Sequence, residues 1–183
     1  IVEMLTKDFG RIAVTAKGAR RPKSSLRGML LPFQPLQATW SGLQDLKSLH
    51  NIEWSDAFSM IKGDALVCGF YLNELIMRLV PKDDPCPKLY DFYHKTILEL
   101  ASNNFLSITL RRFELKLLKE LGYQVPLKID VDGVIIESEK QYFYDAESSA
   151  FTKKISSDQF VISGKTLIDM ANDCYEDSKT EQQ

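Results

Sequence analysis

The sequence predicts an α+β protein in which a small all-β module is followed by a mainly helical domain with short β-hairpins. Three observations support this fold class. Apolar and polar residues alternate with a period of two in short runs up to about residue 54. From Ser55 the period changes to about 3.6, which is typical of amphipathic helices. Residues 127–162 return to strand-like runs before one more helical segment.

The first module is predicted to hold two β-hairpins. The runs "IVEML" and "RIAVTA" alternate on either side of "TKDFG", where Asp8 and Gly10 favour a turn. The runs "FQPLQATW" and "LKSLHNIEW" repeat this pattern around "SGLQD". Four short strands with a basic loop between the second and the third indicate a β-barrel. We place this module at residues 1–54 and the helical domain at residues 55–183.

Three helices are expected in the first part of the helical domain. Ser55 or Asp56 is expected to cap a helix that runs towards Val80 and is stopped by "PKDDPCP". Gly122 is expected to cap the third helix at its C-terminus. The second and third helices are placed at Lys88–Ala101 and Ser107–Leu121.

The last third of the chain alternates between strand-like runs and turns. "DGVII" and "QYFYD" are the clearest strand-like runs, and Asp132–Gly133 is expected to form a hairpin turn. "GKTLIDMAN" predicts one more helix, and "EDSKTEQQ" is typical of a solvated end.

Composition indicates an ordinary globular protein, with 44% hydrophobic and 26% charged residues. No apolar run is long enough to cross a bilayer, so we expect a cytoplasmic location and no membrane partner. Cys68, Cys86 and Cys174 are far apart and odd in number, which favours reduced thiols over disulfides.

Positive charge is concentrated near the N-terminus although the whole chain carries a net charge of −2. Residues 7–27 have a local charge of +6 with Asp8 as their one acid. Clustered lysine and arginine bind the phosphates of nucleic acids regardless of sequence, and a solvated charged loop is the alternative. The predicted DNA-binding residues are Lys7, Arg11, Lys17, Arg20, Arg21, Lys23 and Arg27.

Four aromatic residues near this segment have two possible roles. Aromatic rings on small β-barrels stack on exposed bases, but the same residues also fill barrel cores. The candidates are Phe9, Phe33, Trp40 and Trp54.

Catalytic and metal sites are not predicted. "GARRPKSS" lacks the glycine that a phosphate-binding P-loop needs before its lysine, because Pro22 stands there. His50 and His94 have no second ligand at metal-binding spacing. "DVDG" at 130–133 lacks the later acidic ligands of a calcium loop. We therefore expect no catalytic residues, no metal and no cofactor.

The third predicted helix has an apolar arc bordered by cations. Arg111 lies at the border of the arc, where Glu114 is placed to pair with it. A cation beside an apolar groove suits a peptide that ends in a hydrophobic residue and a free carboxylate, although many soluble helices share this pattern. The arc contains Leu110, Phe113, Leu117, Leu118 and Leu121, and the opposite face contains Arg112, Lys116 and Lys119.

Ordered motifs resemble the RecO family of bacterial recombination mediators. They are "LTKDFGRIAVTAKGARRPKSSLRGMLLPFQPLQATWSG", "DLKSLHNIEW", "GFYLNELIMRLVPKDDPCPKLYDFYHKTI", "LRRFELKLLKELGY" and "ISGKTLIDMA". The resemblance implies an N-terminal OB-fold barrel, a helical domain, and no catalytic centre. It also implies binding of single- and double-stranded DNA in the nucleoid and annealing of strands coated by single-stranded-DNA-binding protein (SSB). Loading of RecA together with RecR is implied as well.

The resemblance also suggests particular residues and departures. Arg111 and Arg112 match the paired arginines of the family's "LRRFE" motif, and with Leu115 and Lys116 they are our candidates for binding the SSB tail. Many members carry four zinc-binding cysteines in the region of residues 122–165, where this chain has none, so apolar packing is expected to hold the hairpins at 127–145. The first barrel strand and final helices of the family are expected to lie outside this sequence. A generic OB-fold binder of single-stranded nucleic acid, RNA included, is the alternative function.

Overall fold

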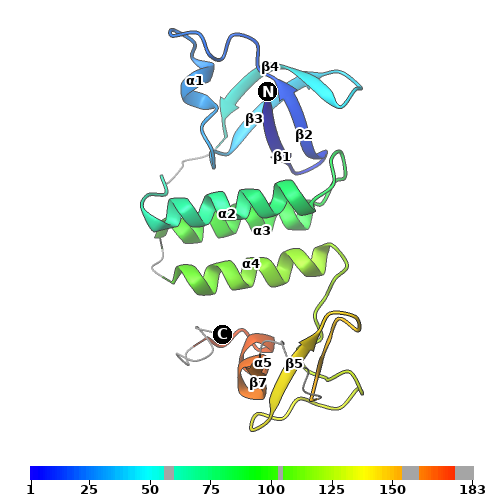
Figure 1. Ribbon diagram of the computed structural model, residues 1–183. Helices are drawn as coiled ribbons and strands as arrows, with labels where there is room; N and C mark the ends of the chain where they lie inside the picture. Colours follow the sequence, from blue (N-terminus) through cyan, green and yellow to red (C-terminus); the bar gives the residue numbers. More distant parts are fainter. Residues whose placement is uncertain (56–59, 103–104, 154–160, 176–183) are drawn as a thin grey trace. The chain divides into compact units, whose positions relative to one another are not determined.

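The computed structural model describes residues 1–55, 60–102, 105–153 and 161–175 (Figure 1). The chain divides into two compact units, Ile1–Phe113 and Glu114–Gln183. The described elements are strands, then helices, then a small sheet, which confirms the predicted α+β class. None of the described helices is both long and apolar enough to span a membrane.

The N-terminal, OB-fold-like part of the chain is a four-stranded sheet with the strand order β1-β2-β4-β3 (Figure 1). Both predicted hairpins are present, because β1 pairs with β2 and β3 pairs with β4 in antiparallel fashion. β2 and β4 pair in parallel and join the hairpins into one sheet. The strands are β1 (Val2–Thr6), β2 (Gly10–Thr15), β3 (Leu36–Ser41) and β4 (Leu46–Trp54).

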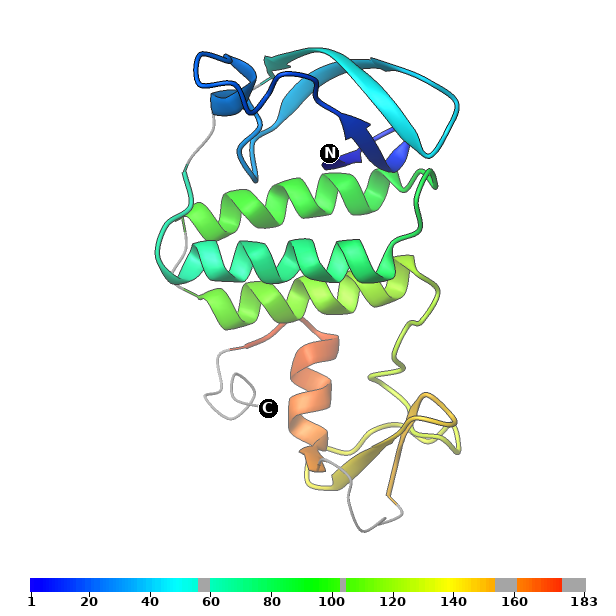
Figure 2. The ribbon, with the colours of Figure 1, turned by 45° about the horizontal axis from the view of Figure 1, so that its top comes forward.

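Two antiparallel helices lie beside this sheet, and a third begins in the same unit (Figure 2). The predictions for the second and third helices are confirmed to within one residue at each end. Apolar residues at helical spacing form the core of this unit. The helices are α2 (Asp64–Leu79), α3 (Pro87–Ser102) and α4 (Leu106–Glu120), and their buried side chains include Leu72, Ile76, Leu89, Ile97, Leu100 and Phe113.

The predicted start of the first helix is wrong. α2 begins at Asp64 and Ser55 lies outside any helix, while Asp56 lies outside the described residues. Gly63 precedes the helix with a φ of +57°, a left-handed conformation that a continuous right-handed helix cannot contain. A helix starting at Ser55 or Asp56 would include Ile61, which is instead buried in the segment before Asp64.

A close backbone contact joins the β1–β2 hairpin to the α2–α3 connection. A Cβ added to Gly10 would lie 2.5 Å from the carbonyl carbon of Asp84, so only glycine fits there. The amide of Asp83 donates a hydrogen bond to the Arg11 carbonyl at 2.9 Å. The Arg11 Nε donates to the Val80 carbonyl at 3.0 Å, and Lys47 forms an ion pair with Asp83. These contacts fix the sheet against the helices of its unit.

The second unit contains a three-stranded sheet with the order β6-β5-β7 and one short helix. The predicted run "QYFYD" is β5, whereas "DGVII" forms an isolated bridge between Ile129 and Ile135 instead of a strand. Asp132–Gly133 belongs to a hairpin turn, as predicted, with Gly133 at φ +77°. The elements are β5 (Gln141–Asp145), β6 (Ala150–Thr152), β7 (Val161–Ser163) and α5 (Gly164–Ala171).

Apolar packing holds this second unit together. Its core cluster takes one residue from the hairpin region, one from each of the three strands and one from α5. Tyr142, on β5, is fully buried. The hydroxyl of Tyr142 also accepts a hydrogen bond from the Glu137 amide at 2.9 Å. The predicted solvated end, residues 176–183, lies outside the described residues. The cluster consists of Ile136, Tyr142, Phe151, Ile162 and Leu167.

Candidate nucleic-acid interface

The segment from Ala16 to Gly28, named here the cationic loop, is a series of tight turns. Its backbone amides donate to carbonyls three residues earlier, as in Arg21 to Gly18 at 3.0 Å and Ser24 to Arg21 at 3.0 Å. Gly18 has a φ of +79°, which favours glycine at this turn. The loop ends in the short helix α1 (Leu26–Met29), which contacts β4. Successive turns therefore give the loop a defined backbone course.

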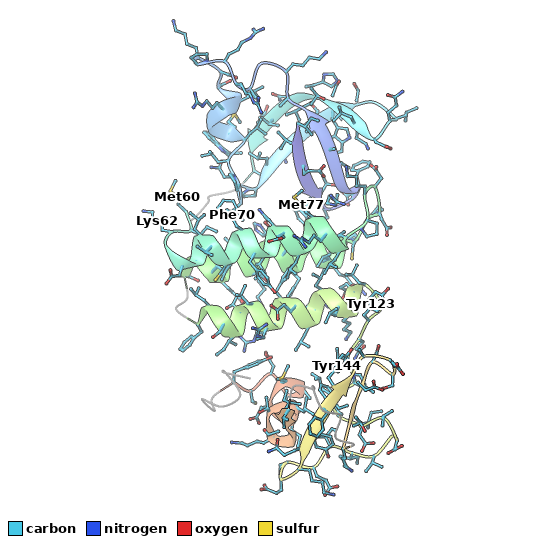
Figure 3. The ribbon with its side chains drawn as sticks, in the orientation of Figure 1. Met60, Lys62, Phe70, Met77, Tyr123 and Tyr144 are labelled. Carbon is cyan, nitrogen blue, oxygen red and sulfur yellow. The ribbon has the colours of Figure 1, made fainter. Side chains whose placement is uncertain are left out.

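All the cations of the cationic loop are exposed to solvent. In the part of the chain that the structure describes, none of them forms an ion pair with a carboxylate. No acid occurs between residues 9 and 34, so the sequence supplies no local counter-charge. In Figure 3, nitrogen-tipped side chains of this loop project away from the sheet. The exposed cations are Lys17, Arg20, Arg21, Lys23 and Arg27.

Lys7 and Arg11, the other two predicted DNA-binding residues, lie outside the cationic loop and are paired. Lys7 Nζ lies 2.8 Å from Asp91 Oδ1, and this hydrogen bond raises the pKa of Lys7. Arg11 lies 3.3 Å from Glu3, and only 12% of its side chain is exposed. The structure thus brings five of the seven cations together and places these two at the contact between the sheet and the helices.

The four candidate aromatic residues have different environments. Phe33 packs edge to face against Phe70, which Figure 3 labels on α2, with ring centroids 5.2 Å apart. Trp40 is half-buried, and its ring meets that of Phe9 at an interplanar angle of 85°. Phe33 and Trp40 therefore contribute to packing, as the alternative interpretation had it.

Trp54 is the most exposed of these four aromatic side chains, at 63%. It is the last residue of β4, and its indole N–H donates to the side-chain oxygen of Gln34 at 2.9 Å. No sequence pattern points to Gln34, because a glutamine twenty residues away carries no local signal of such a contact. This hydrogen bond fixes the orientation of the exposed ring.

The two histidines lie in different environments, one in the sheet and one beside a pocket. The ring of His50 forms a 2.6 Å hydrogen bond with the hydroxyl of Ser41 on the neighbouring strand. His94 lines a pocket of about 280 Å³ between β1, the segment at 30–36 and α3. Among the described residues, no group of three or more histidine, cysteine or acidic side chains is placed to hold a metal.

The four candidate residues for peptide binding lie on consecutive turns of α4. Arg111 is exposed, whereas Arg112, Leu115 and Lys116 are half-buried. Lys116 Nζ lies 2.8 Å from Glu120, an ion pair between residues four apart on the helix. Two residues of the apolar arc, Phe113 and Leu117, are buried, with 0% and 1% of their surface exposed.

Comparison with known proteins gives consistent matches along the chain. The family model described as "Recombination protein O N terminal" matches residues 1–58, and "Recombination protein O C terminal" matches residues 62–166. Three similar curated proteins each bear the name DNA repair protein RecO. The one from Nitrosospira multiformis is 44% identical over 93% of this chain and 72% of its own length. Those from Burkholderia pseudomallei and Azoarcus sp. are 41% and 42% identical over 98% of this chain, covering 66% and 76% of their own lengths.

Proposed function

Because the chain belongs to the RecO family of bacterial DNA repair proteins, we propose that it is a non-enzymatic recombination mediator that holds DNA with its cationic loop. The observation that carries this proposal is the set of exposed cations between residues 16 and 28, none of them ion-paired in the described parts of the chain. A loop of this kind binds polyanions without breaking bonds, so the proposed activity needs no catalytic group.

Phosphate neutralisation explains binding to both single- and double-stranded DNA. Each lysine or arginine that contacts a phosphate releases condensed counterions, whatever the base sequence. Unpaired cations give more of this binding than paired ones, because no competing carboxylate must first be displaced. On this reasoning the five exposed cations of the cationic loop bind DNA, and Lys7 and Arg11 support the sheet that presents them.

Annealing follows from the same charge. Two complementary strands repel each other through their phosphates, and a cationic surface that binds both lowers this repulsion while the bases pair. We include in the proposal that the complementary strands carry SSB, and that RecR assists this protein in loading RecA. These roles rest on membership of the family.

Recruitment of SSB is assigned to α4. The SSB tail is acidic and ends in an apolar residue with a free carboxylate, and arginine is the side chain best suited to bind a carboxylate with two hydrogen bonds. Arg111 and Arg112 supply guanidinium groups on the same turn of α4, and Leu115 lies one turn after Arg111. We include Lys116 in the proposed site because it lies one turn after Arg112 on the same helix.

The salt dependence of DNA binding tests the cationic loop. We expect log K for a single strand to fall against log salt with a slope of about −3.5 if all five cations contact phosphates. Replacing Arg20, Arg21 and Lys23 with glutamine leaves two contacts, so the slope falls to about −1.4. Fluorescence anisotropy of a labelled oligonucleotide at several salt concentrations measures both values.

A control with the same change in net charge separates local contacts from overall charge. Lys62, Lys88 and Lys128 are exposed lysines outside the cationic loop, and their replacement by glutamine is expected to leave the slope nearly unchanged. Equal slopes for the loop variant and the unmodified protein would reject the assignment of the loop to DNA binding.

Titration with a peptide distinguishes the mediator from a generic OB-fold binder. An acidic peptide that ends in phenylalanine is expected to bind the unmodified protein and to bind R111A/R112A at least about tenfold more weakly. K119A removes an exposed cation from the same helix and serves as the control. Failure of the unmodified protein to bind the peptide would favour the generic binder.

A further inference from the structure

We propose that Trp54 is a stacking platform for an unpaired nucleobase and that it gives the DNA site a preference for single strands. This inference rests on the proposed function and adds a base-binding subsite to the phosphate-binding loop. An indole ring offers a large π face, and base stacking on such rings tolerates any sequence. The ligand class is therefore an unpaired base in a strand whose phosphates lie on the cationic loop.

Exposure and orientation of the ring make Trp54 suitable for stacking. A tryptophan side chain that is 63% exposed leaves much apolar area in water, which is unfavourable unless a ligand covers it. The 2.9 Å hydrogen bond from the indole N–H to Gln34 restrains the ring before any ligand arrives. A restrained ring loses little rotamer entropy when a base stacks on it.

The sheet register places Trp54 at the same end of the sheet as the cationic loop. β2 and β4 run parallel, with Thr15 opposite Ser48, and the loop starts directly after Thr15. β4 continues from Ser48 in the same direction and ends at Trp54. The helix α1, which carries Arg27, contacts β4, and both views of the ribbon draw the loop, α1 and this end of β4 together (Figures 1 and 2).

The neighbouring charges are compatible with a DNA strand at this position. Glu53 is the adjacent acid, and its side chain accepts a hydrogen bond from Asn51 at 2.9 Å. Successive side chains of a strand point to opposite faces, so Glu53 and Asn51 lie on the face away from Trp54. Among the described residues, the acid next to Trp54 in the chain thus lies on the other face of β4, and the helix that carries Arg27 contacts the same strand.

The other three candidate aromatic residues do not offer this combination. Phe33 is packed against Phe70, and its ring carbons would lie 3.0 Å from a Cβ added to Gly69, so its face is covered by α2. Phe9 is exposed but lies in the β1–β2 turn, at the end of β2 opposite the cationic loop. Among the four candidate aromatic residues, Trp54 is the one that is both exposed and at the same end of the sheet as the cationic loop.

Affinities for single-stranded and duplex DNA test this subsite. We expect W54A to bind an oligothymidylate about fivefold to tenfold more weakly while its affinity for a duplex of equal length stays unchanged, because paired bases are not available for stacking. W54F keeps an aromatic face and is expected to recover most of the loss. Q34A removes the hydrogen bond and keeps the ring, so it controls for the lost partner and should lose less than W54A.

Intrinsic fluorescence gives a second measurement that does not depend on a weakened variant. The chain has two tryptophans, so in W40F the emission comes from Trp54 alone. Stacking predicts quenching of that emission when oligothymidylate is added and much weaker quenching with duplex DNA. Unchanged single-strand affinity in W54A, or unquenched W40F emission at saturating oligothymidylate, would overturn the inference.

The same experiments separate this inference from the proposed function. If the loop variant loses affinity for both forms of DNA while W54A behaves like the unmodified protein, the DNA-binding proposal stands and the stacking inference fails. If the unmodified protein binds neither form at low salt, both fail together.

Discussion

Replacing Gly10 with alanine is expected to destabilise the first unit more than any other glycine substitution in its sheet. Gly10 has a φ of +68°, and its Cα faces the backbone of Asp84 so closely that a methyl group must displace it. The displaced segment is the α2–α3 connection, which binds the hairpin through Arg11. The substitution therefore combines backbone strain with loss of a long-range contact.

The expected cost is the sum of two effects. The left-handed conformation costs an alanine about 1–2 kcal/mol. Separation of the hairpin from the connection breaks the hydrogen bonds from Arg11 to Val80 and from Asp83 to Arg11, each contributing about 0.5–1.5 kcal/mol. The free energy of unfolding of G10A is thus expected to fall by about 2–5 kcal/mol.

Two glycines of the same unit isolate these effects. Gly42 has a φ of +115° but ordinary spacing, with Lys47 Cα at 3.5 Å from an added Cβ, so G42A measures the strain alone. Gly28 has nothing within 4 Å of an added Cβ, and G28A is expected to be neutral or slightly stabilising. Both tryptophans lie in this unit, so urea unfolding followed by their fluorescence measures its stability. A G10A variant no less stable than G42A would refute the reasoning.

Two further predictions concern the second unit. S163A removes the N-cap of α5, where the Ser163 hydroxyl accepts a hydrogen bond from the Thr166 amide at 3.0 Å. The free energy of unfolding, measured by circular dichroism in urea, is expected to fall by about 1 kcal/mol. An unchanged value would contradict the cap. The hydrogen bond from the backbone N–H of Val134 lowers the pKa of Asp130, and the side chain of Lys153 lowers it further. The contribution of Asp130 to stability is therefore complete above the ordinary carboxyl pKa and is lost as pH falls through the lowered pKa. The stability difference between the unmodified protein and D130N is therefore expected to shrink as pH falls from about 7 to about 3, and a constant difference would exclude Asp130 as its source.

Sequence patterns were sufficient where a structure depends on neighbours along the chain. Alternation located the hairpins β1–β2 and β3–β4, since successive side chains of a strand point to opposite faces of the sheet, as the alternating burial along β3 shows. Gly122 ends α4 as predicted: it has a φ of +87°, and the Tyr123 amide donates to the Leu118 carbonyl at 2.8 Å. The residues that bind DNA or a peptide stay predictions, because they depend on partners.

Sequence patterns failed where a distant contact or one residue's backbone conformation decided the outcome. The start of α2 was misplaced because Ser55 is a good capping residue by type, whereas the conformation of Gly63 sets the boundary. The run "DGVII" forms a single β-bridge instead of a strand. The side chain of Asp130 fixes the turn there by accepting hydrogen bonds from the backbone amides of Asp132 and Val134.

The sequence by itself determined the α+β class, the two N-terminal hairpins and the run of cations between residues 16 and 28, because periodicity and local charge are properties of adjacent residues. Only the tertiary structure decided which cations are already paired and which aromatic ring is exposed. Arg11 meets Glu3 and Val80, and Trp54 meets Gln34, through contacts that the folded chain creates. Such contacts depend on how strands and helices pack, and packing is not encoded in any single segment.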